Sequence, residues 1–403
     1  MPSWQHTMTT RRNGISPAET NRSTVPRRVG AVIRSSAKAF AFDPSVVQLN
    51  HASFGAPTLA ALTWHDAVRR AAEADTQTSL GTGLQDDLRR VGAVVAGLIG
   101  ADAADVAIVA GSTEASGALA TSLPLQAGDV VALTDGEYES VIRAWQLRAQ
   151  AVGATVLRLP LPVPATSAAL VDLFTDLPAR TRYVVLSSIT SSTVLRMPVA
   201  AVARLAAQAG ALLVVDAAHS VGHEPLDVST LGAAAVYGSL HKWLPVPRPL
   251  GFLWVDPSLV DVVRPAAVAL HVDEPLLERF GWRGTWDPAP VRGLERALDE
   301  WRTWSDEGRL DAAAALADRA DQVLTDLGWV PTGEPSIRPA RLRGFVVPAD
   351  LQLLRAALDA AGVRLWTGTV PHGRTAARLA THVYTEEQDL DRLAAVARTL
   401  TTG

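Results

Sequence analysis

The sequence contains no cysteine. This absence excludes disulfide bonds, thiolate metal sites and a cysteine nucleophile. The sequence also lacks a strong excess of charge of either sign. Its 37 basic and 41 acidic residues give a net charge of −4, which argues against a nucleic-acid-binding protein. No apolar run reaches the roughly 18 residues that a membrane span needs, so we expect no membrane contact.

Lysine is almost as scarce. Only Lys38 and Lys242 occur, and arginine supplies the other 35 basic side chains. A guanidinium stays charged and unreactive, whereas a lysine amine can lose its proton and form a Schiff base. Lys38 lies in a Ser/Ala/Arg stretch and looks incidental. Lys242 follows a long apolar segment and is either an ordinary surface amine or a reactive one.

The chain has 403 residues, of which 48% are hydrophobic and 19% charged, enough for two or three globular domains. Residues 1–38 are rich in Arg, Ser, Thr and Pro and lack the apolar stretch of a secretory signal, so we expect a disordered extension and a cytoplasmic protein. We expect an N-terminal segment over 39–60, a large domain over 61–290 and a small C-terminal domain over 291–403.

Between residues 60 and 255, short apolar runs alternate with helical segments, including an amphipathic helix at 86–99. This alternation is typical of βαβ units and predicts the α/β fold class with a mostly parallel sheet. The runs expected to form strands are Val106–Ala110, Val130–Leu133, Arg182–Leu186, Leu212–Val215, Ala233–Tyr237 and Phe252–Val255.

The pattern changes after about residue 290 and indicates a smaller α+β domain. Helices are expected over 292–304, 308–326, 349–361 and 386–400. Strands are expected over Gly344–Val347, Val363–Trp366 and Arg378–Tyr384.

Polar residues follow several of the expected strands, and ligands bind beyond the carboxyl ends of strands in open α/β sheets. Gly111, Ser112 and Thr113 lie between a strand and a helix, where free backbone N–H groups, the helix dipole and two hydroxyls suit a phosphate. The same residues could also form an ordinary helix cap.

Asp216 ends another apolar run. Burying its carboxylate is costly unless it pairs with a cation, such as a protonated pyridine nitrogen; a turn aspartate is the alternative. His219 could reach a neighbouring ligand atom or serve a structural role. Ser239 and His241, just before Lys242, supply donors for a phosphate next to a Schiff base.

A phosphate cradle, a strand-end carboxylate and a rare lysine together match what pyridoxal 5′-phosphate (PLP) requires. The aldehyde would take Lys242, the ring nitrogen Asp216, and the phosphate the helix start. The sequence therefore predicts a PLP-dependent enzyme.

Five segments carry a family resemblance: Phe42–Gly55, Val214–His219, Tyr237–Leu244, Arg283–Asp287 and Ala377–Tyr384. Through them the chain resembles the class V aminotransferase family of fold-type I PLP-dependent enzymes, in particular its isopenicillin N epimerase-like members, over roughly residues 42–400. The resemblance implies a large PLP-binding domain, a smaller C-terminal domain, and an N-terminal segment at the substrate mouth.

The resemblance also implies roles for individual residues. Lys242 would form the Schiff base and move the Cα proton, Asp216 would hold the ring nitrogen, and His219 would contact the phenolic oxygen of the ring. Tyr138 would stack on the ring. The residues expected at the phosphate are Gly111, Ser112, Thr113, Ser239 and His241.

On the substrate side, Arg378 would clamp the α-carboxylate. Without the resemblance, a surface charge before an edge strand is the simpler interpretation of Arg378. Gly284-Thr285 would reach the phosphate of a second subunit, which implies a homodimer. The residues expected to line the substrate mouth are Asn50, His51, Ser53 and Phe54.

Within such a family, the absence of cysteine excludes a persulfide mechanism. Lyases for S-substituted cysteines, such as those of ergothioneine and lincosamide pathways, need no thiol. We therefore expect a β-eliminating C–S lyase that acts on a bulky cysteine conjugate in specialised metabolism. Epimerisation, transamination, decarboxylating oxidative deamination and a non-catalytic binding protein are the alternatives. The 11 tryptophans suit a bulky substrate or simply fill the core.

Overall fold

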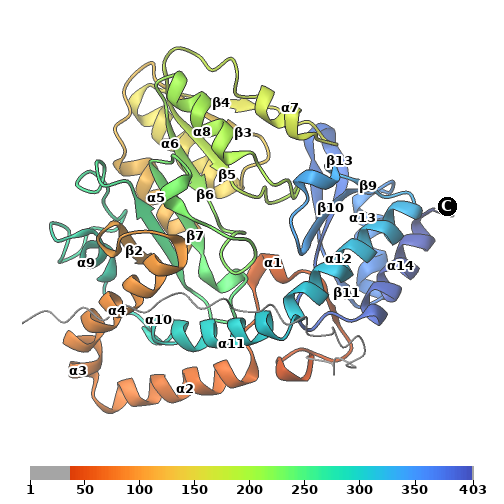
Figure 1. Cartoon of the computed structure of the whole chain (residues 1–403), viewed down its shortest axis with the longest axis horizontal. Coiled ribbons are helices and arrows are strands. Elements are labelled where there is room, and N and C mark those ends of the chain that lie inside the picture. The colour runs from red at the N-terminus through yellow and green to blue at the C-terminus, as the bar shows by residue number, and fades with distance from the viewer. Residues whose placement is uncertain (1–36, 402–403) are drawn as a thin grey trace, which may run out of the picture. The chain divides into compact units, whose positions relative to one another are not determined.

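The computed structural model describes residues 37–401 (Figure 1). The expected extension over 1–38 therefore lies, apart from Ala37 and Lys38, outside the described residues. None of the helices in residues 37–401 combines the length and hydrophobicity that a membrane span requires.

A seven-stranded sheet forms the centre of the larger part, with strand order β2-β8-β7-β6-β5-β3-β4. Only β8 runs antiparallel to its neighbours, which confirms the prediction of a mostly parallel sheet. The edge strand β4 was not predicted, because its alternating sequence is only partly buried. The strands are β2 (Val106–Val109), β3 (Val130–Thr134), β4 (Thr155–Leu159), β5 (Thr181–Ser187), β6 (Leu212–Asp216), β7 (Ala235–Ser239) and β8 (Gly251–Val255).

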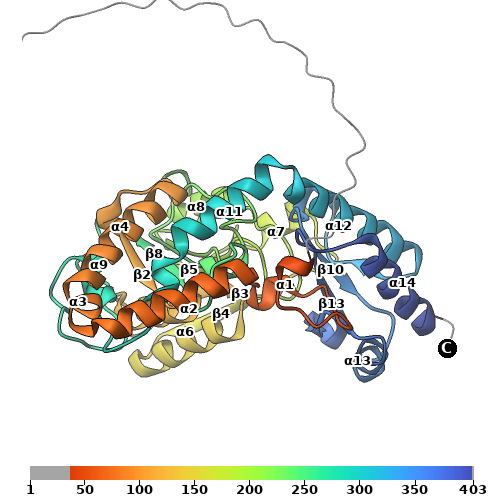
Figure 2. The same ribbon diagram turned by 90° about the horizontal axis from the view of Figure 1, so that it is seen from below.

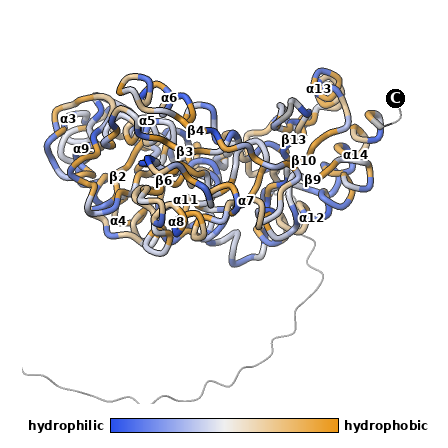
Figure 3. The backbone as a smooth tube through the Cα atoms, turned by 90° about the horizontal axis from the view of Figure 1, so that it is seen from above, coloured by the Kyte–Doolittle hydropathy of each residue, from blue (hydrophilic) through white to orange (hydrophobic). Residues whose placement is uncertain are grey.

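Helices cover both faces of this sheet, as α/β folds require. Successive residues of a strand point to opposite faces, so Val106 and Ile108 join one core while Ala107 and Val109 join the other. Figure 3 shows hydrophobic and hydrophilic residues alternating along the chain. The first face packs on α4 (Thr82–Ile99), α8 (Val199–Gln208), α10 (Ala289–Arg292) and α11 (Leu294–Asp306), and the second on α5 (Ser112–Ser122), α6 (Glu139–Val152) and α9 (Leu276–Gly281).

A second, antiparallel sheet has the order β12-β13-β10-β9. Three helices pack with it around a separate core. Its elements are α12 (Arg309–Asp326), β9 (Val330–Pro331), β10 (Leu342–Val346), α13 (Leu351–Ala360), β12 (Trp366–Val370), β13 (Arg374–Ala380) and α14 (Glu387–Thr401).

The strand expected over Arg378–Tyr384 is corrected by the structure, since β13 begins at Arg374 and ends at Ala380. Thr381 turns away from the sheet and donates its hydroxyl to the Ala313 carbonyl at 2.7 Å. Tyr384 packs its ring against Phe40. The apolar residues after Ala380 therefore fill a core contact outside the strand.

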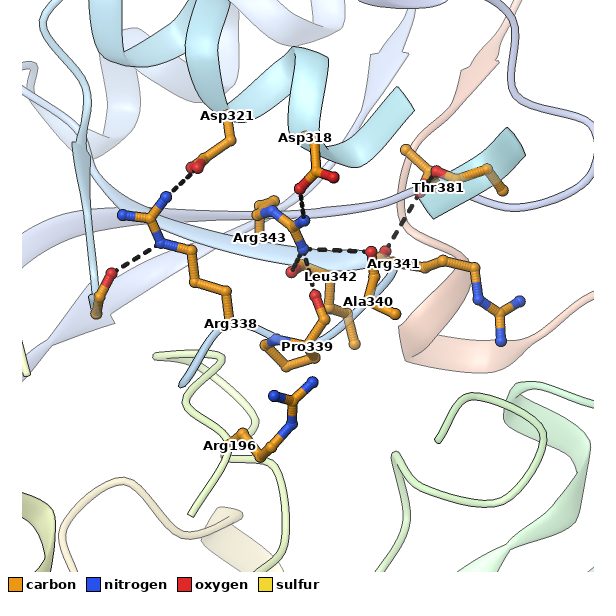
Figure 4. A network of polar contacts seen from close by, with 12 residues as sticks. Arg196, Asp318, Asp321, Arg338, Pro339, Ala340, Arg341, Leu342, Arg343 and Thr381 are labelled. Carbon is orange, nitrogen blue, oxygen red and sulfur yellow. Dashed lines mark hydrogen bonds and ion pairs between the residues drawn. The ribbon is translucent and has the colours of Figure 1, made fainter. Parts of the chain in front are cut away.

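An arginine-rich segment fastens the second sheet to α12. Figure 4 shows Arg338 reaching Asp321 and Arg343 reaching Asp318, both carboxylates of that helix. Arg343 also donates to the Leu342 carbonyl at 2.7 Å. These charge-assisted bonds hold the start of β10 in place.

The N-terminal segment connects the two sheets. β1 (Val47–Gln48) pairs with β11 (Val363–Arg364), and α1 (His51–Phe54) follows directly. Helix α2 (Leu59–Ala74) lies beside α11, where Thr58 donates to Glu300 at 3.0 Å (Figure 2).

Two short helices complete the larger part, namely α3 (Thr76–Leu80) and α7 (Ser167–Asp172). Leu294 and Leu298 of α11 belong to the core under the large sheet.

The domain boundaries expected at 60/61 and 290/291 stay a prediction.

Candidate active site

A cavity of about 480 Å³ opens where β2, β5, β6 and β7 end. The carboxyl ends of the parallel strands meet at this edge of the sheet, as expected for a ligand site. Of the residues predicted from the sequence, those that line the cavity are Ser53, Phe54, Gly111, Ser112, Thr113, Tyr138, Asp216, His219, Ser239, His241, Lys242 and Arg378.

One end of the cavity is a cradle of uncharged donors at the start of α5. Ser112 and Ser239 place their hydroxyl oxygens 3.0 Å apart, and the Ser112 N–H donates to Ser239 Oγ at 3.3 Å. A Cβ on Gly111 would lie 3.5 Å from Ser239 Oγ and 3.6 Å from His241 Cε1, so a side chain there would narrow the cradle. An anionic phosphate fits this end.

The backbone of Leu250 orients the His241 ring. His241 Nδ1 lies 2.8 Å from the Leu250 carbonyl oxygen and 3.2 Å from the Leu250 N–H. Burial lowers the pKa of His241 to about 4, so the ring is neutral at the cradle.

Asp216, at the end of β6, also lines the cavity. Its Oδ1 accepts the Ala218 N–H at 2.8 Å, and no ion pair to Asp216 occurs within residues 37–401. Burial raises its pKa, while the Ala218 hydrogen bond and the charge of Lys242 oppose the rise. A buried carboxyl of this kind fits a cationic ring nitrogen.

His219 lines the cavity beside Asp216 and is buried. Its Nδ1 has no hydrogen-bond partner among the described residues. Burial, followed by the charges of Lys242 and Arg378, holds the pKa of His219 well below its ordinary value. The imidazole is therefore neutral and keeps an unused polar atom for a ligand.

Lys242 ends a short 3₁₀ turn, Leu240–Lys242, that follows β7. Burial lowers the pKa of its amine to about 8, Asp216 raises it, and Arg378 lowers it further. About one tenth of the amine is thus unprotonated at pH 7, far more than for an ordinary lysine, and the neutral form is the one that attacks an aldehyde. The sequence left open whether Lys242 is an ordinary surface amine, and its burial answers that question.

Arg378 lies on β13, between β12 and β10, and is 2% exposed. It donates to the Ser191 carbonyl at 2.7 Å and to Ser53 Oγ at 2.6 Å. Burial lowers its pKa to about 10. Because Arg378 is buried on an inner strand, the interpretation as a surface charge before an edge strand is wrong. Its guanidinium has no carboxylate partner within residues 37–401, so it suits an anionic ligand group.

Three predicted site residues lie outside the cavity lining. Asn50 Oδ1 accepts hydrogen bonds from Arg378 Nη2 at 3.4 Å and from the Ser53 hydroxyl at 2.7 Å, so Asn50 helps to orient the guanidinium. His51 points away from the cavity, with Nδ1 3.0 Å from the Tyr384 hydroxyl. Thr285 does not line the cavity of its own chain, and its reach into a neighbouring subunit stays a prediction.

Four further residues line the cavity. Ser187 ends β5 and Ser191 follows it, at the strand end where ligands bind in α/β sheets. Ile189 and Trp366 add apolar surface, and Trp366 is one of the tryptophans weighed in the sequence for a bulky substrate. Trp366 also faces the Arg378 guanidinium, with its ring centroid 5.5 Å from Cζ.

Glu114 also lines the cavity, at the phosphate-type end. It accepts the Ala110 N–H at 2.6 Å and pairs with Arg283 at 2.7 Å. The Arg283 guanidinium stacks over the Trp286 ring at 4.4 Å. Because Arg283 balances the Glu114 carboxylate, this end of the cavity is not repulsive to an anion.

The aminotransferase class V family model matches residues 64–393. The chain therefore belongs to this family of PLP-dependent enzymes, and PLP is its cofactor. The arrangement above fits that cofactor, with a neutral donor cradle for the phosphate, a buried carboxyl for the ring nitrogen and a buried amine, all in one cavity. Which residue makes each contact is taken up below as a proposal.

Individual relatives agree with the family. The isopenicillin N epimerase of Streptomyces clavuligerus is 29% identical over 394 residues, covering 89% of this chain and 96% of that protein. A putative L-cysteine desulfhydrase of Oryza sativa subsp. japonica is 29% identical over 293 residues, covering 68% and 61%.

Among solved structures, a mutant of C-DES with glycine covalently linked to its PLP cofactor superposes with a TM-score of 0.78 at 21% identity. It covers 91% of this chain and 99% of that one. The superposition confirms the predicted fold-type I architecture.

Proposed function

We propose that this protein is a β-eliminating C–S lyase that acts on a bulky S-substituted L-cysteine in specialised metabolism. The observation that carries the proposal is the buried, carboxylate-free Arg378 in the same cavity as Lys242. A PLP enzyme that acts on an α-amino acid needs a group that binds the α-carboxylate and a lysine amine that transfers the Cα proton, both in one cavity. The cysteine-free sequence removes the thiol-transfer alternative.

When bound, PLP supplies an electrophilic carbonyl carbon and a ring that withdraws electrons from the substrate Cα. Arg378 holds the α-carboxylate through its two terminal nitrogens. Asp216 would keep the ring nitrogen cationic, and the neutral His219 imidazole would face the neighbouring ring oxygen. Ser112, Ser239 and His241 would hold the phosphate without adding charge.

Lys242 carries the proton transfer. Its amine, with a pKa of about 8, accepts the Cα proton onto Nζ and can return a proton to the leaving sulfur. The Cα–H and Cβ–S bonds break, the electron pair of Cα–H forms a Cα=Cβ bond, and that of Cβ–S leaves with sulfur. The thiol and 2-aminoacrylate result, and water converts 2-aminoacrylate to pyruvate and ammonia.

The substituent on sulfur would lie against the apolar part of the cavity. Phe54, Ile189 and Trp366 line it, and the side chain of Phe54 is 67% exposed at the edge of α1. An exposed aromatic ring beside a cavity favours a large substituent that covers it. The same proposal includes a cytoplasmic homodimer in which Gly284-Thr285 approaches the neighbouring phosphate.

The test supplies the purified, PLP-loaded enzyme with β-chloro-L-alanine and a series of S-substituted L-cysteines of increasing size. Pyruvate, ammonia and thiol are measured together. Equal yields of the three are expected from each S-substituted cysteine, with higher kcat/KM for larger substituents; β-chloro-L-alanine should give pyruvate and ammonia in equal yield, with chloride in place of a thiol. Substrate consumption without pyruvate would overturn the lyase assignment.

The two lysines offer a matched pair of variants. Lys242→Ala should abolish turnover and the covalent attachment of PLP after borohydride reduction. Lys38→Ala should retain both. Normal turnover by the Lys242→Ala variant would refute the role given to this amine.

Epimerisation at Cα is the second candidate, favoured by the near full-length similarity to isopenicillin N epimerase. It needs an acid on the face of the substrate opposite Lys242. Tyr138, which lines the cavity and is 52% exposed, is the side chain we would test. Exchange of the Cα hydrogen with loss of optical activity, and without pyruvate, would favour this reaction; keto-acid formation with retained sulfur would instead indicate transamination or oxidative deamination.

A further inference from the structure

A second carboxyl lies buried near Asp216. Glu137 follows β3, is 6% exposed and does not line the cavity itself. Its Oε1 accepts the Thr134 hydroxyl at 2.8 Å, and its Oε2 accepts the Ser187 N–H at 2.8 Å. The Ser187 hydroxyl also donates to Oε2.

These bonds tie Glu137 to the strand that neighbours Asp216. Ser187 ends β5 and stands opposite Asp216 in the parallel register of β5 and β6. Asp216 in turn stands opposite Tyr237 on β7. Glu137, Ser187, Asp216 and Tyr237 therefore form a polar row across the ends of adjacent strands.

The two carboxyls of the row act on each other. Burial and then the charge of Asp216 raise the pKa of Glu137 to about 7, against the Ser187 and Thr134 hydrogen bonds. The other titratable groups described at this row are Tyr237, whose pKa is raised, and Lys242, which faces Asp216. Both hydroxyl partners of Glu137 can rotate, so the cage accepts the carboxyl with or without a proton.

We propose that Glu137 is a positioning residue for the cofactor: through Ser187 it fixes the strand end beside Asp216, and its ionisation strengthens the hold of Asp216 on the cationic ring nitrogen. The proposal rests on PLP binding and not on the choice between elimination and epimerisation. Glu137 touches neither substrate nor cofactor and acts only through its neighbours.

A measurable consequence follows from charge coupling. The cationic ring nitrogen that binds Asp216 favours the ionised form of Glu137, so PLP binding near neutral pH should expel a proton from Glu137. If binding lowers the pKa of Glu137 from about 7 by about one unit, this group alone releases about 0.4 proton per PLP at pH 7.

The experiment titrates the cofactor-free protein with PLP in a calorimeter at pH 7, in buffers of different ionisation enthalpy, to count released protons. Glu137→Gln keeps the size of the side chain but cannot ionise. Its amide oxygen can accept both Ser187 donors, and its NH2 group can donate to the Thr134 hydroxyl. We expect it to release about 0.4 proton fewer than the wild type. Glu300→Gln is the matched control, because Glu300 is another partly buried carboxyl, bonded to Thr58 far from the cavity.

A second variant covers the case in which Glu137→Gln does not fold. Thr134→Val removes one donor that lowers the pKa of Glu137 and preserves the shape of the buried side chain. The pH at which proton release is greatest should then move upward. The visible absorbance of bound PLP, titrated from pH 5 to 8.5, should lose a component near pH 6 in Glu137→Gln, since binding lowers the pKa of Glu137 by about one unit. Proton release and an absorbance titration equal to the wild type in both variants would overturn the proposal.

Discussion

Arg378 shows how much a single side chain decides in this protein. Its guanidinium is buried against the neutral partners Ser191, Ser53 and Asn50, so its charge is left for a ligand. The Lys242 amine is buried in the same cavity, and the positive charge of Arg378 helps to lower the pKa of this amine. In the proposed reaction, Arg378 would recognise the substrate carboxylate and Lys242 would transfer the proton.

Replacing Arg378 by lysine should raise KM about 10- to 100-fold with a smaller effect on kcat. The charge remains, but the paired donors that match a carboxylate are lost. Steady-state kinetics on the preferred substrate measures the effect. Arg374→Lys, on the same strand and bonded to the Val163 carbonyl, is the control and should leave KM unchanged. An unchanged KM in Arg378→Lys would contradict the proposal that Arg378 binds the substrate carboxylate.

The pH dependence of PLP capture should report the Lys242 amine. Its pKa is lowered to about 8, so the reactive neutral form increases as the pH rises through 8 and saturates above about 9. Stopped-flow absorbance of PLP uptake by the cofactor-free protein gives this midpoint. Arg378→Gln should move it upward, since a positive charge that lowers the pKa is removed. A midpoint near the ordinary lysine value would contradict the burial argument.

At the scale of elements, the site depends on α1 meeting the turn that carries Lys242. Gly55 ends α1 with a φ of 65°, and a Cβ there would lie 1.8 Å from the His241 carbonyl oxygen. Arg248 donates to the Phe54 carbonyl at 2.7 Å and secures the same contact from the following loop. The mouth of the cavity and the lysine turn are therefore one packed unit.

Gly55→Ala should destabilise the protein by about 3 kcal/mol or more, because the new methyl group meets backbone that cannot move aside. Weaker PLP binding should accompany it. Gly97→Ala is the matched control: Gly97 lies on the exposed side of α4 with nothing within 4 Å of a Cβ. That substitution should stabilise by about 0.5–1 kcal/mol. Urea unfolding of both variants checks the contrast, and equal effects would contradict it.

At the scale of the whole described chain, a buried ring cluster joins the N-terminal segment to both sheets. His51 of α1 stacks on His382, with centroids 3.8 Å apart, and His223 stacks on Trp243 at 4.0 Å. The Arg341 guanidinium lies 4.9 Å from the Trp243 ring. Burial, reinforced by the charge of Arg341, lowers the pKa of His51 to about 3 and holds those of His223 and His382 well below their ordinary value.

This cluster should make the protein sensitive to acid. Because the folded-state pKa values lie below the unfolded value of about 6.5, the unfolded chain binds protons that the buried rings refuse. Stability is complete above about pH 6.5 and falls as the pH decreases, by up to about 1.4 kcal/mol per pH unit for each ring. Urea unfolding between pH 7.5 and 5 measures the slope.

His382→Phe should reduce that slope by the contribution of one ring while keeping the aromatic stack. Trp304→Phe, which alters the ring packed edge-on against His382, should change stability at every pH without changing the slope. A slope in His382→Phe equal to that of the wild type would show that this imidazole does not carry the pH dependence.

The sequence by itself determined the parts that depend on local pattern. Alternating apolar runs and helices gave the mostly parallel sheet, because backbone periodicity is a property of neighbouring residues. The scarcity of lysine and the strand-end position of Asp216 singled out two residues that meet in one cavity. The edge strand β4 escaped prediction because it is only partly buried, and the bounds of β13 were misplaced because Val383 and Tyr384 are buried by contacts outside the strand.

Only the tertiary structure decided how polar side chains are used. Apart from the family resemblance, nothing in the sequence distinguishes Arg378, and its burial comes from the position of β13 between β12 and β10. Glu137 gains its significance from Ser187, fifty residues further on, and from the register that sets Ser187 opposite Asp216. Desolvation and charge coupling depend on distance in space, and pairing between remote strands sets that distance.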